Sequence, residues 1–136
     1  MTAIVYALLI RECQVLLQLR QGTGFMDGMW SAAAAGHIEP GESPTAAVIR
    51  EAREELGLCL EEADLHPLAV VQRRDDRTDS AKFVEDHFFF TRKWSGNPAI
   101  AEPDRAADLR WFSLKDLPPN VVLHELSALH RLAQKQ

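Results

Sequence analysis

The spacing of apolar residues predicts strands over most of the chain. The run Thr2–Ile10 is almost continuously apolar, which is typical of a buried strand. Residues 14–20 place Val15, Leu17 and Leu19 on one face, so these two segments are expected to form a hairpin. Further strands are expected over 30–37, 66–73, 82–94 and 107–112, and the mixed-charge segment 73–80 is expected to be a solvated hairpin tip.

Two segments carry helix signals. Ser43 can accept a free backbone N–H, Pro44 suits the first helical position, and Gly57 suits a left-handed C-terminal position, which predicts a helix over about 44–56. Asn120 is expected to cap a second helix that ends near Ala133. Strands, a helix, more strands and a closing helix indicate an α/β layered fold. The 136 residues suit one domain, so we expect a single domain over 1–136.

Three carboxylates gather on one face of the first predicted helix. At about 100° per residue, Glu51, Glu54 and Glu55 share an arc of about 100°, next to an apolar arc that contains Val48 and Leu56. Side chains three and four residues apart lie within about 6 Å, where like charges repel. A bound cation would relieve that repulsion. Clustered carboxylate oxygens suit Mg²⁺ or Mn²⁺, so we expect one of these ions as the cofactor.

The segment 36–58 resembles the Nudix box, G-x5-E-x7-R-E-U-x-E-E-x-G-U, in which U is a bulky aliphatic residue. The matching residues are Gly36, Glu42, Arg50, Glu51, Glu54, Glu55, Gly57 and Leu58. Ala52 stands where a larger aliphatic residue is more common, and the chain lacks the proline that often precedes the box. The resemblance implies a Nudix-type α/β/α sandwich around a mixed β-sheet. It also implies a hydrolase that cleaves a nucleoside diphosphate linked to a group X.

The resemblance also implies roles for the residues of the box. Glu51, Glu54, Glu55 and the carbonyl of Gly36 would be metal ligands. Arg50 would orient the glutamates by charge-assisted contacts, and is counted with them as catalytic. Glu42 and Gly57 would be structural. The alternative, a solvated acidic helix with pairs such as Arg50–Glu54, is disfavoured by the complete box. His37 occupies a variable position and is expected to face solvent or to pack.

Members of this family often use a further carboxylate outside the box as ligand or base. Two candidate places are available: Glu85 and Asp86, at the start of the strand 82–94, and Glu102, in the loop before the last strand. Its position on a strand leads us to favour Glu85 as the additional metal ligand. Each of the two could equally be an ordinary surface carboxylate.

Substrate-binding candidates come from the glycine-rich loop 21–28 and the segments around it. Phe25 or Met26 could hold a base or another flat group, while Trp30 is expected to pack under the sheet. Arg20, Phe25 and Asp108 are our substrate-binding candidates, and Arg105 is an alternative to Asp108 for contact with a base edge.

Composition narrows the range of partners. The net charge of −5 argues against a binder of duplex nucleic acid. Cys13 and Cys59 lack metal-ligand spacing and suit a reduced, cytoplasmic protein. No apolar run reaches transmembrane length and no signal peptide is recognised. We expect a small-molecule nucleotide as substrate, and a monomer or homodimer.

Several functions fit these features. The leading hypothesis is a metal-dependent, MutT-like hydrolase of nucleoside di- or triphosphates. An ADP-sugar or similar diphosphate is an alternative substrate, and a non-catalytic nucleotide sensor is an alternative function. The sensor is disfavoured because it has no need of Glu51, Glu54 and Glu55 together. Triphosphate-ended RNA is disfavoured because no basic stripe is present.

Overall fold

The computed structural model describes residues 2–75 and 82–136. The strands are β1 (Thr2–Arg11), β2 (Gln14–Arg20), β3 (Trp30–Ala32), β4 (Ala34–His37), β5 (His66–Asp75), β6 (Lys82–Thr91) and β7 (Ala106–Ser113). The helices are α1 (Pro44–Leu56), the short 3₁₀ helix η1 (Glu62–Asp64) and α2 (Leu123–Gln134).

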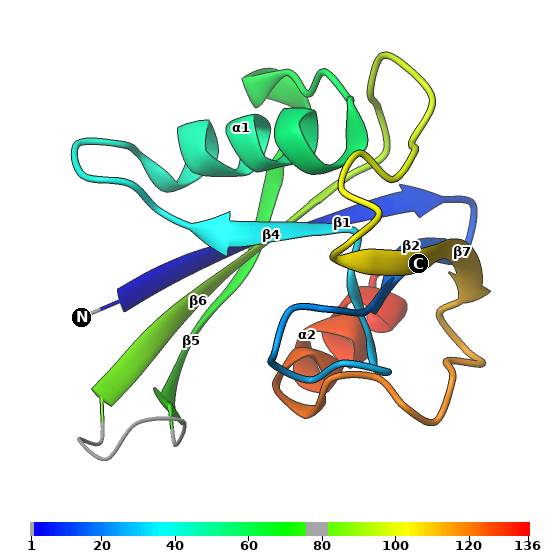
Figure 1. Cartoon of the computed structure of the whole chain (residues 1–136). Coiled ribbons are helices and arrows are strands. Elements are labelled where there is room, and N and C mark those ends of the chain that lie inside the picture. Colours follow the sequence, from blue (N-terminus) through cyan, green and yellow to red (C-terminus); the bar gives the residue numbers. More distant parts are fainter. Residues whose placement is uncertain (1, 76–81) are drawn as a thin grey trace.

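β1 organises the sheet. It runs parallel to β6, antiparallel to β4 over residues 4–7, and antiparallel to β2 at Ile10 and Arg11. The strand order is β3-β2-β1-β6-β5, with β4 on β1 and β7 on β2 (Figure 1). The parallel β1–β6 pair among antiparallel neighbours makes this a mixed sheet, as expected.

The two principal helices cover opposite faces of the sheet. α1 lies on one face and α2 on the other (Figure 1). Strand side chains alternate, so β1 sends Val5, Ala7 and Leu9 toward α1 and Leu8 and Ile10 toward α2. Each set joins a separate hydrophobic core with its helix. The expected α/β/α sandwich is confirmed.

The caps predicted for α1 are present. Ser43 Oγ accepts a hydrogen bond from the backbone N–H of Ala46 at 3.1 Å, and Pro44 is the first helical residue. Gly57 has φ 69°, a conformation that favours glycine, and its N–H bonds back to the last turn. The sequence therefore fixes both ends of the helix that carries the carboxylates.

The strand expected over 30–37 is wrong as a single element. It divides at Ala33 into β3, which pairs with β2, and β4, which pairs with β1. The small alanines allow the chain to pass between neighbouring strands, and Trp30 is buried in the core on the α2 side as expected. The strand expected to reach Trp94 also ends earlier, at Thr91.

The start of the second helix differs from the prediction too. α2 begins at Leu123 without a side-chain cap, and the Asn120 amide donates instead to the carbonyl of Gly28 at 2.8 Å. Asn120 therefore ties the loop between β2 and β3 to the segment before α2. Most of the predicted charged tip 73–80 lies outside the described residues. No helix of the described part is long and apolar enough to cross a membrane.

Candidate active site

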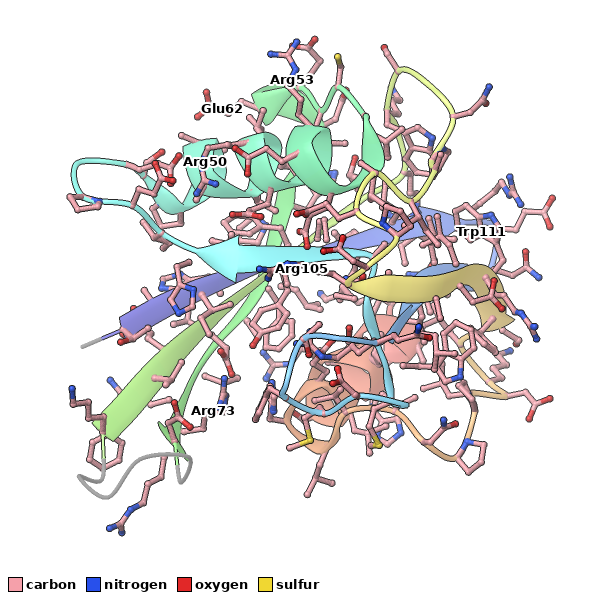
Figure 2. The ribbon with its side chains drawn as sticks, viewed as in Figure 1. Arg50, Arg53, Glu62, Arg73, Arg105 and Trp111 are labelled. Atoms are coloured by element: carbon pink, nitrogen blue, oxygen red, sulfur yellow. The ribbon has the colours of Figure 1, made fainter. Side chains whose placement is uncertain are left out.

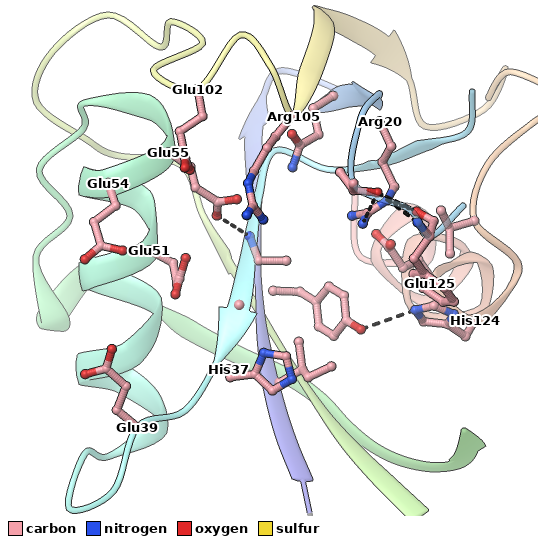
Figure 3. A pocket seen from close by; sticks show the side chains of 18 of the residues that line it. Arg20, His37, Glu39, Glu51, Glu54, Glu55, Glu102, Arg105, His124 and Glu125 are labelled. Carbon is pink, nitrogen blue, oxygen red and sulfur yellow. Dashed lines mark hydrogen bonds between the residues drawn. The ribbon is translucent and has the colours of Figure 1, made fainter. Parts of the chain in front are cut away.

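A cavity of about 490 Å³ lies between α1 and α2, at the edge formed by β4 (Figure 3). On one side, the α1 wall carries carboxylates. On the opposite side, the α2 wall carries cationic and aromatic side chains. The α1 wall consists of Gly36, His37, Glu39, Glu51, Glu54, Glu55 and Glu102. The α2 wall consists of Ile4, Tyr6, Gln18, Arg20, Thr23, Phe25, Ala35, Arg73, Val122, His124 and Glu125, and Arg105 lies between the two walls (Figure 3).

The three glutamates predicted on one helix face do line a common space. Glu51, Glu54 and Glu55 extend from α1 toward β4 (Figure 3). Gly36 makes room for them, because a Cβ atom there would collide with the Glu51 carboxylate. Glu55 Oε2 accepts a hydrogen bond from the N–H of Ala35 at 2.8 Å. The lack of a side chain at Gly36 therefore leaves the space that the Glu51 carboxylate occupies.

The local electrostatics show that negative charge is crowded here. Burial raises the pKa of the Glu51 carboxyl and raises that of Glu55 to about 8. The neighbouring charge of Glu51 adds to the increase at Glu55, and Glu102 contributes a smaller part. Two desolvated carboxylates side by side favour the binding of a positive charge between them.

Arg50 links the loop before α1 to the carboxylates. Its Nε and Nη2 atoms donate to Glu42 at 2.8 and 2.9 Å, and Nη2 also reaches the carbonyl of His37 at 3.0 Å. Its Nη1 atom donates to Glu51 at 2.7 Å and to Glu54 at 3.3 Å. The hydrogen bonds from Arg50 lower the pKa of Glu42 to about 2. Glu42 is therefore an anionic anchor for Arg50.

The donors available on this wall suit a hard divalent cation. They are carboxylate oxygens and a backbone carbonyl, the ligand types that Mg²⁺ and Mn²⁺ prefer. Within the described ranges, no three acidic, histidine or cysteine side chains converge closely enough to hold an ion as they stand. Glu54, whose side chain is 56% exposed, is turned toward Arg50. The donor chemistry fits a metal, and Glu54 has the freedom to turn toward it.

The two carboxylates expected outside the box occupy different places. Glu102 lines the cavity, because the backbone of Ala101 bonds to the carbonyl of Glu55 at 3.0 Å and holds this loop on the end of α1. Glu85 lies on β6 and contacts His87 at 2.7 Å. It is absent from the described cavity lining, and β6, which carries it, pairs with β1, whereas the cavity lies beside β4. The loop contact that brings Glu102 in carries no sequence signal.

On the α2 wall, Arg20 supports the loop that carries Phe25. Arg20 Nε donates to the carbonyl of Phe25 at 2.8 Å, and Nη2 donates to Thr23 Oγ1 at 3.1 Å. Asp27 Oδ1 accepts from the hydroxyl of Thr23 at 2.6 Å and further tightens the turn. Phe25 lines the cavity, whereas Met26 is 40% exposed and does not line it.

A buried polar group lies beneath this wall. Asp86 is fully buried and accepts hydrogen bonds from the Tyr6 hydroxyl at 2.8 Å and from Arg73 Nε at 2.5 Å. Tyr6 also contacts His124 Nε2 at 3.3 Å. Burial raises the pKa of Tyr6, so its hydroxyl remains a donor. Sequence reasoning missed this group, because the parallel β1–β6 pairing that brings Tyr6 close to Asp86 has no local signal.

Asp108 is placed away from the cavity lining. Its carboxylate pairs with Arg110 at 2.6 Å and accepts the N–H of Leu109 at 2.8 Å. Arg105, the alternative to it, does line the cavity, and its side chain extends toward the carboxylates (Figure 3). Figure 2 shows Arg105 near the centre of the view, with Arg50 of α1 above it and Arg73 of β5 below it.

Solved structures share this fold and this arrangement of elements. A MutT NUDIX hydrolase from Burkholderia pseudomallei is 30% identical, with a TM-score of 0.86 over 96% of this chain and 97% of that one. The ORF135 protein of E. coli is 25% identical, with a TM-score of 0.73 over 98% of this chain and 89% of that one. The expected enzyme class, a Nudix hydrolase, is confirmed at the level of the family.

Sequence relatives point to the same family. An NAD-capped RNA hydrolase NudC from Stutzerimonas stutzeri is 30% identical over 102 residues, which cover 75% of this chain. The chain spans about a third of the length of that relative, because the match covers 33% of it. Residues 1–132 match the family model described as the NUDIX domain. The chain therefore belongs to the Nudix family.

Proposed function

We propose that this chain hydrolyses a phosphoanhydride bond of a nucleoside di- or triphosphate, with Mg²⁺ or Mn²⁺ as cofactor. One observation carries the proposal: the carboxylate α1 wall faces an α2 wall with arginines and Phe25 across a single cavity. Such a cavity offers one end to a metal-bound phosphate chain and the other to a base. Its volume of about 490 Å³ lies within the range of small-molecule sites.

The α1 wall would hold the cation. Glu51, Glu54, Glu55 and the carbonyl of Gly36 are the proposed ligands, and Arg50 orients Glu51 and Glu54 through its hydrogen bonds. A divalent ion at this place would neutralise phosphate oxygens and acidify a water molecule. Glu42 holds Arg50 in position, and Gly57 ends the helix at the correct residue.

Glu102 is the proposed general base. It lies in the cavity near Glu55, where it can accept a proton from the attacking water. The water oxygen forms a new bond to phosphorus while the bridging P–O bond breaks and the leaving phosphate departs. We propose Glu102 for this role in preference to Glu85, because Glu85 pairs with His87 outside the described cavity lining.

The substrate is proposed to be a small nucleotide. Arg105 lines the cavity and offers positive charge to phosphate groups, and Arg20 fixes the backbone of Phe25 on the same cavity. The NudC relatives are named for NAD-capped RNA, and NAD carries a pyrophosphate of the same chemical kind. A diphosphate-linked dinucleotide is therefore the second candidate substrate. The net charge of −5 continues to disfavour duplex nucleic acid.

A screen that identifies the nucleotide products by chromatography tests this proposal, because cleavage of NAD or ADP-ribose gives two phosphomonoesters and no free phosphate. The panel contains nucleoside triphosphates, nucleoside diphosphates, ADP-ribose and NAD, each with Mg²⁺ or Mn²⁺. We expect the wild type to turn over at least one class of substrate. Glu54→Gln should reduce this turnover by at least about 100-fold, because losing a metal ligand costs more activity than losing a residue that only orients a ligand. Glu62→Gln removes an exposed carboxylate in η1 and should retain full activity. Nucleotide binding without any turnover would instead support the sensor.

A further inference from the structure

The position of Glu102, the proposed general base, is set by the backbone of its own segment. In the described part of the chain, the Glu102 carboxylate makes no hydrogen bond or ion pair. Residues 101–105 are all exposed, and a second cavity of about 20 Å³ borders Glu102, so packing does not hold this turn either. What keeps Glu102 beside Glu55 (Figure 3) is therefore the way in which the main chain is fastened.

Backbone hydrogen bonds fasten this segment at both ends. At one end, the N–H of Ala101 donates to the carbonyl of Glu55, in the last turn of α1, at 3.0 Å. At the other end, the N–H of Gln21 donates to the carbonyl of Arg105 at 3.0 Å. Residues 99–105, here called the bridging segment, thus join the end of α1 to the start of the glycine-rich loop.

Gly22 lets the glycine-rich loop touch the bridging segment. Its φ of 71° favours glycine, and a Cβ atom at this position would collide with the carbonyl oxygen of Asp104. Asp104 lies inside the turn that the N–H of Arg105 closes on the carbonyl of Glu102 at 3.0 Å. A displacement of the Asp104 carbonyl would therefore move the turn that carries Glu102.

Resting on the proposed function, we propose that Gly22 is a positioning residue for Glu102, because its contact with the Asp104 carbonyl sets the place of the turn that carries the base. A general base must stand within hydrogen-bond reach of the water that it deprotonates. A displacement of about 1 Å can lower the rate by about 100-fold. Gly22 is absent from the described cavity lining, so it acts through the turn and not by contact with the substrate.

Gly22→Ala and Gly24→Ala form a matched pair of variants. Both glycines have a positive φ, but a Cβ atom at Gly24 would meet nothing within 4 Å. The conformational cost is thus similar, and only Gly22→Ala adds the collision. With the substrate found in the screen, we expect kcat to fall by about 10- to 100-fold in Gly22→Ala. Gly24→Ala should keep the wild-type kcat, with any change confined to KM, and both variants should bind Mn²⁺ as the wild type does.

A double-mutant cycle shows whether Gly22 acts through Glu102. If it does, Gly22→Ala should add little to the loss of kcat caused by Glu102→Gln, because changes that remove one shared interaction are not additive. Two losses that multiply would overturn the inference. A folded Gly22→Ala protein with wild-type kcat, or with reduced Mn²⁺ affinity, would also overturn it.

Gln21→Pro tests the same link if Gly22→Ala does not fold. Proline removes the N–H that holds the Arg105 carbonyl. Arg20 is the last residue of β2, and its extended conformation suits the position before a proline. Gln21→Ala is the control, because it keeps the N–H. We expect kcat to fall by about 10-fold or more in Gln21→Pro and to stay unchanged in Gln21→Ala, and equal kcat values would overturn the inference.

Nuclear magnetic resonance separates this inference from the proposed function. In isotope-labelled protein without substrate, the amide signals of Ala101 and Glu102 should shift in Gly22→Ala and stay in place in Gly24→Ala. Signals that do not shift in Gly22→Ala overturn the inference, and turnover that depends on Glu54 would then leave the proposed function intact. Shifted signals in a protein that hydrolyses nothing would support the link between Gly22 and Glu102 and reject the proposed function.

Discussion

Arg50 and Glu42 are joined by two hydrogen bonds, from Nε to Oε2 at 2.8 Å and from Nη2 to Oε1 at 2.9 Å. The pair fastens the loop before α1 to the helix, and the remaining Nη1 atom reaches Glu51 and Glu54. A planar guanidinium can make these contacts at once, whereas a single ammonium group has no such fork.

We therefore predict that Arg50→Lys reduces kcat by about 10- to 100-fold, the usual cost of losing a group that orients metal ligands. Steady-state kinetics measures the effect. Arg53→Lys is the control, since Arg53 is exposed on the same helix (Figure 2) and should retain activity. Equal activity of the two variants would show that the fork does not orient the carboxylates.

Gly36→Ala is predicted to disturb the carboxylate wall specifically. The added methyl group would meet the Glu51 carboxylate and force it away from Glu55. We expect Mn²⁺ affinity to fall while circular dichroism stays close to wild type, because Gly36 has no left-handed conformation to lose. Titration calorimetry with Mn²⁺ measures this affinity. An unchanged affinity would mean that Glu51 is not a metal ligand.

Asp86→Asn is predicted to destabilise the fold. It would leave Arg73 without its buried counter-charge and weaken the acceptor for Tyr6. Breaking one side of a buried pair typically costs about 3 kcal/mol or more, so urea denaturation should show a loss of that order. The double variant Asp86→Asn with Arg73→Gln should recover part of the loss. No recovery would mean that the Tyr6 contact, and not the ion pair, carries the stability.

We predict that the ionisation of Glu125 makes the free energy of unfolding depend on pH. Burial raises the pKa of the Glu125 carboxyl in the folded state to about 7, above its ordinary value of about 4.5. Between these two values the folded state binds more protons than the unfolded state, so the contribution of Glu125 to stability falls as pH rises from about 4.5 to 7. Such a difference in pKa corresponds to roughly 3 kcal/mol of stability.

Denaturation curves of the wild type and Glu125→Gln at several pH values test this prediction. Relative to the wild type, Glu125→Gln should become more stable as the pH rises from about 4.5 to 7. The control Glu62→Gln should show the same pH dependence as the wild type. A constant difference between the wild type and Glu125→Gln would show that Glu125 titrates alike in the folded and unfolded states.

Some features of this chain depend only on residues that are close together in the sequence. The ends of α1 were predictable because Ser43, Pro44 and Gly57 act on backbone groups a few residues away. The gathering of Glu51, Glu54 and Glu55 was predictable because helical periodicity places them on one face. The almost continuous apolar run of residues 2–10 likewise predicted the buried strand β1.

Other features required chain segments far apart in the sequence to meet. Glu102 enters the cavity because Ala101 bonds to the end of α1, and Tyr6 reaches Asp86 because β1 lies parallel to β6. The break at Ala33 follows from pairing with two different strands. The sequence alone thus determined the helix, the carboxylate face and the layered fold. Only the tertiary structure decided what faces the carboxylates, since loop contacts and strand order leave no periodic trace in the chain.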